Sequence, residues 1–286
     1  MANLSLNPMA TTNAAGSFGV QSDGFIQGVA LDDPANRFNL ASGTVAATET
    51  KPLWGGLPVA ELLPGVNSSP RGSTIRRAVS LAELEGFTVF NQAHNGLTTP
   101  QSPVPLYASG MSVSFYRLGS NMRVPLKASA QVVALGTAGA SVKTPLAWDF
   151  VNNQVTTAAA AAFAGADIAT TAVTYSNGVA TATTASAHGL TAGQYVKISG
   201  VAPAAYNGTV VVLSVPSTTT FTYAPASAPG GSATTQGTIG AVAQADITLP
   251  VKVISIESGN SKTVSYDSAT GFLIWNNTDS CALVLL

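Results

Sequence analysis

The sequence predicts an all-β protein. Only 9% of its 286 residues are charged, against roughly 25% in an average soluble domain, so long helices with charged faces are excluded. Short runs alternate apolar with polar residues, which is the period of a half-buried strand. The chain also contains 27 glycines and 16 prolines, and these residues separate the runs as turn formers. Together these features favour short strands joined by turns.

Residues 1–50 form the first segment, which we interpret as an extended arm. Isolated apolar positions lie there among Asn, Ser, Thr, Gly and Ala, without sustained helical or strand periodicity. Such a segment cannot bury enough apolar surface to offset the entropy lost on ordering. The arm is therefore expected to be either disordered or ordered against another subunit.

Residues 51–167 together with residues 241–286 are expected to form the β core. The spacing of Ser80 and Glu83 matches a capping box and predicts one or two helical turns before Gly86. The expected strands are residues 87–90, 111–116, 124–135, 247–253, 262–266, 272–275 and 281–286. Turn formers at residues 258–261, 267–271 and 276–279 separate the C-terminal strands and predict a β-meander.

Residues 168–240 are expected to form an inserted domain, because this stretch is very rich in Thr and Ala. Asn177 and Gly178 predict a hairpin between residues 173–175 and 179–181, since both turn residues tolerate positive φ. Further strands are expected at residues 194–198, 209–215, 219–223 and 234–239. Roughly six short strands at regular spacing predict a small β-sandwich or barrel.

The residues that carry chemistry are few and scattered. The two histidines, His94 and His188, fall in different predicted domains, and each lies in a turn-like connection. No spacing of Cys, His or carboxylate residues matches a zinc or calcium site, and no glycine run matches a phosphate loop. Cys281 lies in an apolar run and is expected to be buried. We therefore expect no enzyme activity, no metal and no cofactor.

Trp54 and three arginines are the candidate partner-binding residues. Arg71, Arg76 and Arg77 form the only basic cluster of the sequence, in a predicted loop. They are either solvated there or form an ion-pair site between subunits, to which bidentate guanidinium groups are suited. Trp54 stands beside glycines that permit close approach of another backbone, and it is either a core residue or an interface anchor.

The charge balance argues against nucleic-acid and membrane partners. Lys and Arg number 12 and Asp and Glu 13, which gives a net charge of −1, whereas both partners require clustered basic charge. The apolar residues 158–172 contain Asp167 and are fewer than the roughly 18 that a membrane span needs. No export signal is visible at the N-terminus. We expect a soluble protein.

Two sets of motifs resemble those of bacteriophage virion proteins. GFTVFNQAHNG (residues 86–96), GMSVSFYRLGS (residues 110–120) and AWD (residues 147–149) resemble the phage structural cement family. AHGLTAGQYVKISG (residues 187–200), YNGT (residues 206–209) and TFTY (residues 220–223) resemble a small β-domain that recurs in phage virion proteins. The cement-family resemblance covers most of residues 50–165 and the C-terminal meander.

The cement-family resemblance implies a capsid decoration protein. Such a protein binds the outer surface of an icosahedral phage head and stabilises contacts between neighbouring major capsid proteins. The resemblance also implies a jelly-roll or barrel-like core and a location on the outer capsid surface after synthesis in the host cytoplasm. The low-charge, helix-poor composition and the arm fit a protein that is ordered against partners, and we expect a homo-oligomer, a dimer or trimer, on the capsid.

Two other classes of virion protein are open alternatives. One is a tail-fibre or surface adhesin whose inserted domain binds host glycan. The other is a polysaccharide-degrading enzyme, which the shortage of acidic and histidine clusters disfavours, as does the lack of a short internal repeat. Binding to expanded heads or to cells separates the cement protein from the adhesin.

Overall fold

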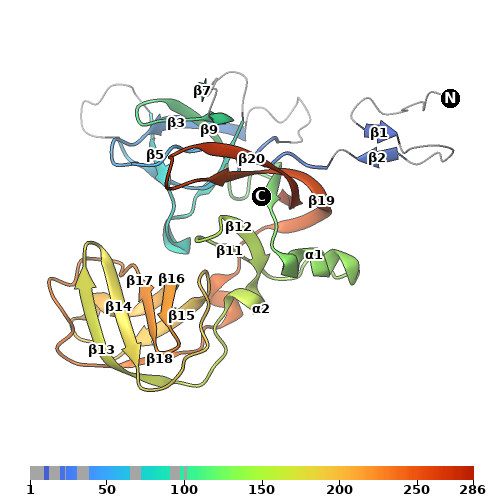
Figure 1. Cartoon of the computed structure of the whole chain (residues 1–286). Helices are drawn as coiled ribbons and strands as arrows, with labels where there is room; N and C mark the ends of the chain where they lie inside the picture. Colours follow the sequence, from blue (N-terminus) through green and yellow to red (C-terminus); the bar gives the residue numbers. More distant parts are fainter. Residues whose placement is uncertain are drawn as a thin grey trace. The chain divides into compact units, whose positions relative to one another are not determined.

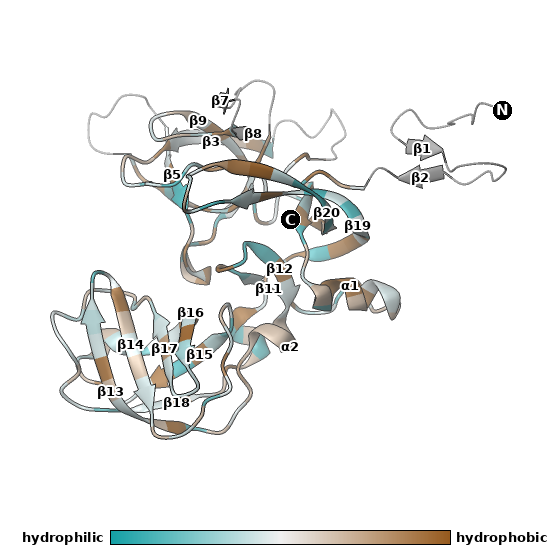
Figure 2. Ribbon diagram, in the orientation of Figure 1, coloured by the Kyte–Doolittle hydropathy of each residue, from teal (hydrophilic) through white to brown (hydrophobic). Residues whose placement is uncertain are grey.

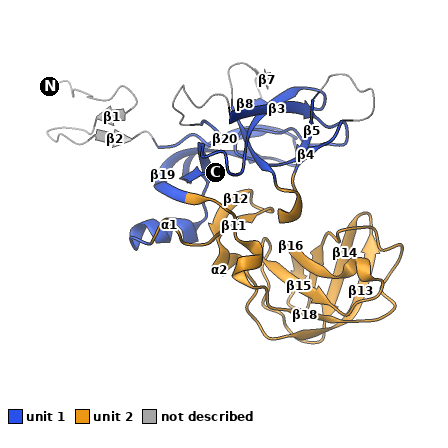
Figure 3. Ribbon diagram, turned by 180° about the vertical axis from the view of Figure 1, so that it is seen from behind, with its two compact units in different colours: residues 1–77, 85–140, 253–286 blue, residues 78–84, 141–252 orange. Residues whose placement is uncertain are grey.

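The computed structural model describes residues 10–12, 20–22, 24–30, 39–64, 72–90, 97–99 and 102–286 (Figure 1). Strands make up 48% of the structure and helices 10%, and two of its sheets are closed barrels, which confirms the all-β prediction. The chain divides into two compact units, each built from separate stretches of sequence (Figure 3). Unit 1 comprises residues 1–77, 85–140 and 253–286, and unit 2 comprises residues 78–84 and 141–252.

Unit 1 contains a closed five-stranded barrel. Its strands, in spatial order, are β3 (Leu40–Val45), β5 (Thr74–Arg77), β4 (Pro58–Leu62), β6 (Gly86–Val89) and β9 (Ser112–Arg117). β3 and β5 run parallel, and the other neighbours are antiparallel. Phe87, Val113 and Phe115 are fully buried inside. Ser114 and Tyr116, which alternate with Val113 and Phe115 along β9, are buried as well, so both faces of this strand are covered.

The arm expected over residues 1–50 extends too far along the chain. Residues 40–45 form β3, which pairs along five positions with β9 and joins the barrel. This strand was missed because its apolar residues are few and small, and the two strands beside it supply its packing. Upstream, β1 (Ala10–Thr12) and β2 (Val20–Ser22) form a two-stranded antiparallel sheet of their own.

A three-stranded sheet completes unit 1, in the order β10 (Arg123–Lys127), β20 (Leu273–Leu285) and β19 (Lys252–Tyr266). The sequence predicts shorter strands here, and that prediction is wrong. β19 continues through the expected turn at residues 258–261, with Gly259 at a φ of 79°, and β20 continues through residues 276–279. Turn-forming side chains are tolerated inside these strands because neighbouring strands satisfy their polar groups, as Asp279 illustrates.

Asp279 connects the three strands of this sheet through its side chain. Its Oδ2 accepts a hydrogen bond from Thr263 Oγ1 of β19 at 2.7 Å and lies 3.2 Å from Lys127 Nζ of β10. Burial works against the charged form, but the Thr263 hydroxyl, the Ser280 N–H and Lys127 outweigh it and lower the pKa of Asp279. The carboxylate is therefore a cross-strand link in its ionised form.

One expected strand is replaced by a helix. Residues 124–135 were predicted to be extended, but β10 ends at Lys127 and α1 spans Ala130–Thr137. Ser129 adopts an extended conformation and its side chain caps the helix by accepting a hydrogen bond from the Val132 N–H. The apolar residues of this run fit either a strand or a helix. The Ser129 N-cap and the Ala and Gln that follow it favour the helix.

Short connecting elements surround these sheets. The helical turn predicted from the capping-box spacing is a single 3₁₀ turn, η2 (Leu81–Glu83). Ser80 makes no side-chain cap there, and Glu83 instead accepts from the Val79 N–H, so the reciprocal capping box is absent. A small hairpin pairs β7 (Leu97–Thr99) with β8 (Ser102–Leu106).

Residues 25–28, which we call the strap, lie along the outer edge of β19. Gln27 N–H donates to Lys262 O at 2.9 Å, and Lys262 N–H donates to Phe25 O at 2.8 Å, in a parallel bridge. The side chain of Gln27 is buried, and its Oε1 accepts from the Val264 N–H at 3.0 Å. A polar side chain therefore takes the place of one backbone partner at this edge.

The strap also contacts the barrel of unit 1 through Gly28. Gly28 N–H donates to Pro125 O of β10, and Gly28 O accepts from Phe90 N–H, just after β6. A Cβ on Gly28, which has a φ of 74°, would lie 2.3 Å from the backbone of Gly55. Only glycine fits both this conformation and this close approach.

Unit 2 contains a closed six-stranded barrel. Its strands, in spatial order, are β13 (Ile168–Ser176), β14 (Val179–Thr184), β17 (Thr220–Tyr223), β16 (Gly208–Ser217), β15 (Tyr195–Ser199) and β18 (Thr238–Gly240). The hairpin predicted at Asn177 and Gly178 is confirmed, with both residues at positive φ between β13 and β14. Ile168 pairs with Ile239, so the two ends of the barrel segment lie side by side.

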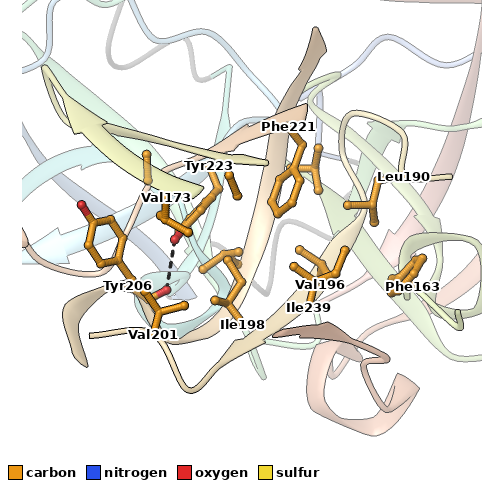
Figure 4. Packing of buried hydrophobic residues seen from close by; sticks show 14 residues of the cluster. Phe163, Val173, Leu190, Val196, Ile198, Val201, Tyr206, Phe221, Tyr223 and Ile239 are labelled. Carbon is orange, nitrogen blue, oxygen red and sulfur yellow. Dashed lines mark hydrogen bonds between the residues drawn. The ribbon is translucent and has the colours of Figure 1, made fainter. Parts of the chain in front are cut away.

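Apolar side chains fill the interior of this second barrel. Figure 4 shows residues from every wall converging on the centre, among them Val173, Ile198, Phe221 and Ile239. Tyr223 donates its hydroxyl to Tyr206 O at 3.3 Å, so this polar group is satisfied within the core. Tyr206 belongs to a 3₁₀ turn, η3 (Ala204–Tyr206).

The second barrel shares an apolar cluster with the chain on either side of it. The flanking elements are β11 (Leu146–Asp149), β12 (Gln154–Thr157), α2 (Ala158–Ala161) and η4 (Gln244–Ile247). Tyr195 of β15 packs there against Ala147, Ala158 and Ile247, and its hydroxyl donates to Trp148 O at 2.6 Å. Unit 2 is thus larger than the insertion expected at residues 168–240.

We predict that residues 141–252 fold more stably as an isolated fragment than residues 168–240. The shorter fragment loses the apolar partners of Tyr195 and exposes that side chain to water, which costs about 2–3 kcal/mol of apolar burial. Thermal melting followed by near-ultraviolet circular dichroism checks this. Equal melting temperatures for the two fragments would contradict it.

We also predict that Asp279 makes unit 1 sensitive to acid. Because its pKa is lowered in the folded chain, its contribution to stability is complete above the unfolded value of about 3.9 and is lost as the pH falls through the folded value. Asp279→Asn should therefore flatten the fall in melting temperature below about pH 4. Asp246→Asn, at an exposed position of η4, is the control and should leave the acid limb unchanged.

Candidate functional site

Trp54, the expected interface anchor, lies inside unit 1. Its side chain is 2% exposed and packs in the apolar cluster of the barrel, with Leu57, Val59 and Tyr107 among its members. Of the two interpretations of Trp54, the structure therefore agrees with that of a core residue. A side chain this deeply buried cannot contact a partner protein without a rearrangement of the barrel.

Two stacked aromatic rings, those of Trp54 and Tyr266, each have a cationic side chain nearby. The Arg77 guanidinium carbon lies 4.8 Å from the Trp54 ring centroid, on one side of the ring. Tyr266 of β19 stacks against Trp54 with centroids 6.2 Å apart and ring planes 15° apart. Lys51 Nζ lies 5.5 Å from the Tyr266 centroid. We call these four residues the cation–aromatic stack.

Arg77 is held in the stack by backbone and carboxylate groups. Its Nη2 donates to Pro52 O at 3.1 Å, and its backbone N–H donates to Glu49 Oε2 at 2.8 Å. Burial lowers the pKa of Arg77, and the nearby charge of Glu49 opposes that effect. Since a guanidinium stays protonated at any physiological pH, the stack contains a buried cation stabilised mainly by an aromatic face and a carbonyl.

The glycines beside Trp54 permit a close backbone approach, but the approaching segment belongs to the same chain. A Cβ on Gly55 would lie 2.6 Å from the Phe90 ring, and Gly56, at a φ of 83°, packs against the side chain of Gln27. The strap therefore occupies the place at which the sequence suggested a partner. The glycines beside Trp54 correctly indicated a close backbone approach. This geometry does not support the interpretation that the approaching backbone belongs to another molecule.

The basic cluster does not lie in a single loop. Arg76 and Arg77 belong to strand β5, where they pair opposite Ala60 and Val59 of β4. Arg76 is partly exposed, and its Nη1 donates to Arg77 O at 3.2 Å. Arg71 lies outside the described residues. Of the four candidates, Trp54 and Arg77 are thus in contact, and Arg76 and Arg77 are both partly exposed.

The other chemical groups of the described chain are mostly enclosed. Cys281 is fully buried, and burial raises its pKa to about 12, so the thiol stays protonated. His188 is 4% exposed, its Nδ1 accepts from the Leu190 N–H at 3.0 Å, and its ring meets Phe221 edge-on. These contacts give His188 a structural role in the second barrel. His94 lies outside the described residues.

Sequence reasoning missed three members of this arrangement. Tyr266 and Lys51 extend the stack, and Glu49 receives the Arg77 backbone N–H. The alternation of Val264 and Tyr266 along one strand face could have indicated that Tyr266 points into the core. Its pairing with Trp54 carries no local sequence signal.

Within the part of the chain that the structure describes, no group of three or more His, Cys, Asp or Glu side chains could hold a metal ion. No helix among the described residues is long and apolar enough to cross a membrane. Comparisons of this chain with protein-family models, with curated proteins and with solved structures found no match.

We predict that the adjacent arginines differ in their effect on stability. Arg77→Ala should lower the free energy of unfolding by about 2–4 kcal/mol, because it removes a desolvated cation–π contact and a charged hydrogen bond. Arg76→Ala should cost about 1 kcal/mol or less, as expected for a partly exposed side chain. Urea unfolding of both variants checks this, and equal losses would show that the stack does not stabilise the barrel.

Proposed function

We propose that this chain is a structural protein of a bacteriophage particle, a cement or decoration protein. It binds the outer surface of an icosahedral head and stabilises contacts between neighbouring major capsid proteins. The main support is the position of two of the three motifs that resemble the cement family, because they lie on neighbouring strands of unit 1, whereas the third, residues 147–149, lies on β11 of unit 2.

Two of the resembling stretches meet in the first barrel. Residues 86–89 of the first stretch form β6 and residues 112–117 of the second form β9, and these strands pair directly. Phe87 lies opposite Tyr116, and Thr88 lies opposite Phe115, with all four side chains buried. The resemblance therefore follows a packed pair of core strands, and scattered surface similarity would not produce this pairing.

The second set of motifs also maps onto one core. Residues 187–200, 206–209 and 220–223 supply Leu190, Val196, Ile198, Tyr206, Phe221 and Tyr223 to the interior of the second barrel. Because side chains fill this barrel, its binding surfaces are its outer faces and loops. Attachment by an outer face suits a protein that adds to an existing shell.

The proposed partners follow from the same family. The major capsid protein is the partner, the outer capsid surface is the location, and a dimer or trimer is the form on the capsid. Arg76 remains the candidate for an ion pair with the capsid, because it combines partial exposure with a position on a strand of the first barrel.

A tail-fibre or surface adhesin is the second candidate, favoured by a row of hydroxyl side chains on the second barrel. Thr174, Thr181, Thr222 and Ser214 lie side by side on four neighbouring strands. Ser214 Oγ and Thr222 Oγ1 are 2.6 Å apart. Aligned hydroxyls can donate to and accept from the hydroxyls of a host glycan.

Co-sedimentation with expanded, undecorated heads tests the proposal. We predict that the full chain pellets with heads, and that Arg76→Ala weakens this binding about three- to tenfold at low salt and less at high salt, where charges are screened. Arg123→Ala, at an exposed position of β10, is the matched control and should bind as the parent does.

The adhesin alternative predicts a different outcome of the binding experiments. Binding to host cells without binding to heads, abolished by Thr222→Val, would replace the cement function with the adhesin. Melting temperatures of all variants should match the parent, so that a loss of binding is not a loss of folding.

A further inference from the structure

The outer edge of β19 is unpaired over much of its length among the described residues. β20 lies on one side of β19, and on the other side the strap pairs only near Lys262. No backbone hydrogen bond joins residues 253–258 to another described segment on that side. We call residues 253–258 the open edge.

The open edge has the composition of a strand that is usually covered. Val253, Ile254 and Ile256 are β-branched and apolar, and Ile254 is 47% exposed. Figure 2 shows hydrophobic stretches alternating with hydrophilic ones along β19. Glu257 is the only charged residue of the segment. Natural proteins protect exposed edges with lysines, prolines or bulges, because free backbone groups pair readily with other strands.

The same side of β19 already accepts an extended segment of chain. Ile26 pairs in parallel with Lys262, so a strand continued backwards from Phe25 would run along the open edge. The described part of this extended run begins at Gly24. Gly24 has a φ of 76°, a left-handed conformation that ends an extended run, and a Cβ there would meet Asn260 O.

The N-terminal hairpin of β1 and β2 is a sheet of two short strands. β1 and β2 consist of three residues each, and among the residues that the structure describes they pair only with one another, so β2 has one edge without a described partner. A two-stranded hairpin is marginally stable in water and gains from a third strand. Within the described ranges the open edge has no backbone partner, although β2 ends only shortly before the strap.

We infer that the open edge of β19 is a docking site for a second copy of this chain, whose strand β2 pairs with residues 253–258. Main-chain hydrogen bonds supply the contact, as in other cases of strand addition. When two copies exchange their hairpins reciprocally, both open edges are filled and the assembly closes as a dimer. This inference needs no capsid, so its test is separate from the test of head binding.

Sedimentation velocity of the full chain, without heads, measures the association. The parent should form a concentration-dependent closed oligomer, and Ile254→Lys should raise its dissociation constant about tenfold or more, since an edge lysine opposes strand addition. Ile274→Lys is the matched control, because Ile274 is 48% exposed but lies on β20, the middle strand of the sheet. Deleting residues 1–22 should abolish association and leave the strap in place.

Cysteine pairs identify which copy supplies the strand. Cys281 is buried, so Gln21→Cys and Ser255→Cys introduce the two thiols used for cross-linking. A mixture of the two single variants should give a disulfide-linked dimer on mild oxidation, and each variant alone should not give this product in quantity.

Three outcomes would overturn the inference. The first is a chain that stays monomeric at every concentration tested. The second is equal weakening by Ile254→Lys and Ile274→Lys. The third is a double variant, Gln21→Cys with Ser255→Cys, that cross-links only within a single chain, because β2 would then cover its own open edge.

Discussion

The hydrogen bonds of the strap are the constraint on which unit 1 depends. Gln27 and Gly28 bond to β19, to β10 and to the residue after β6, so one short segment fixes three parts of the unit. Gln27 is 1% exposed, and its side-chain Oε1 accepts a hydrogen bond from the Val264 N–H. A buried amide is costly without its partner, so this position has little tolerance for other side chains.

The position of Trp54 follows from the strap. Gly55 and Gly56 lie against Gly28 and the Gln27 side chain at distances that exclude a Cβ. This packing holds the turn after Trp54, and the Trp54 carbonyl accepts from the hydroxyl of Thr88 on β6. The indole is thereby presented between Arg77 and Tyr266. The cation–aromatic stack thus depends on two glycines and one amide that are not part of it.

Local signals allowed the all-β class and several strands to be predicted, whereas long-range contacts decided the rest. The hairpin at Asn177 and Gly178 was predictable because two residues determine its geometry. The helix α1 was not, because Val132 and Val133 fit a strand equally well until the Ser129 cap is considered. The prediction that Trp54 is an interface anchor failed for a similar reason. The glycines beside Trp54 correctly indicate a close approach, but Gln27, which makes that approach, is an ordinary polar residue in an unremarkable segment.

The division of unit 1 along the chain imposes an order on synthesis. Ribosomes make proteins from the N-terminus, and domains can fold as soon as their residues emerge. The main body of unit 2, residues 141–252, is complete before β19 and β20 exist, whereas the sheet of unit 1 needs both strands. During translation the second barrel can therefore close before Tyr266 and the rest of β19 are available to pack against the first barrel. A nascent chain in that interval lacks Tyr266, the ring that stacks on Trp54 in the complete unit.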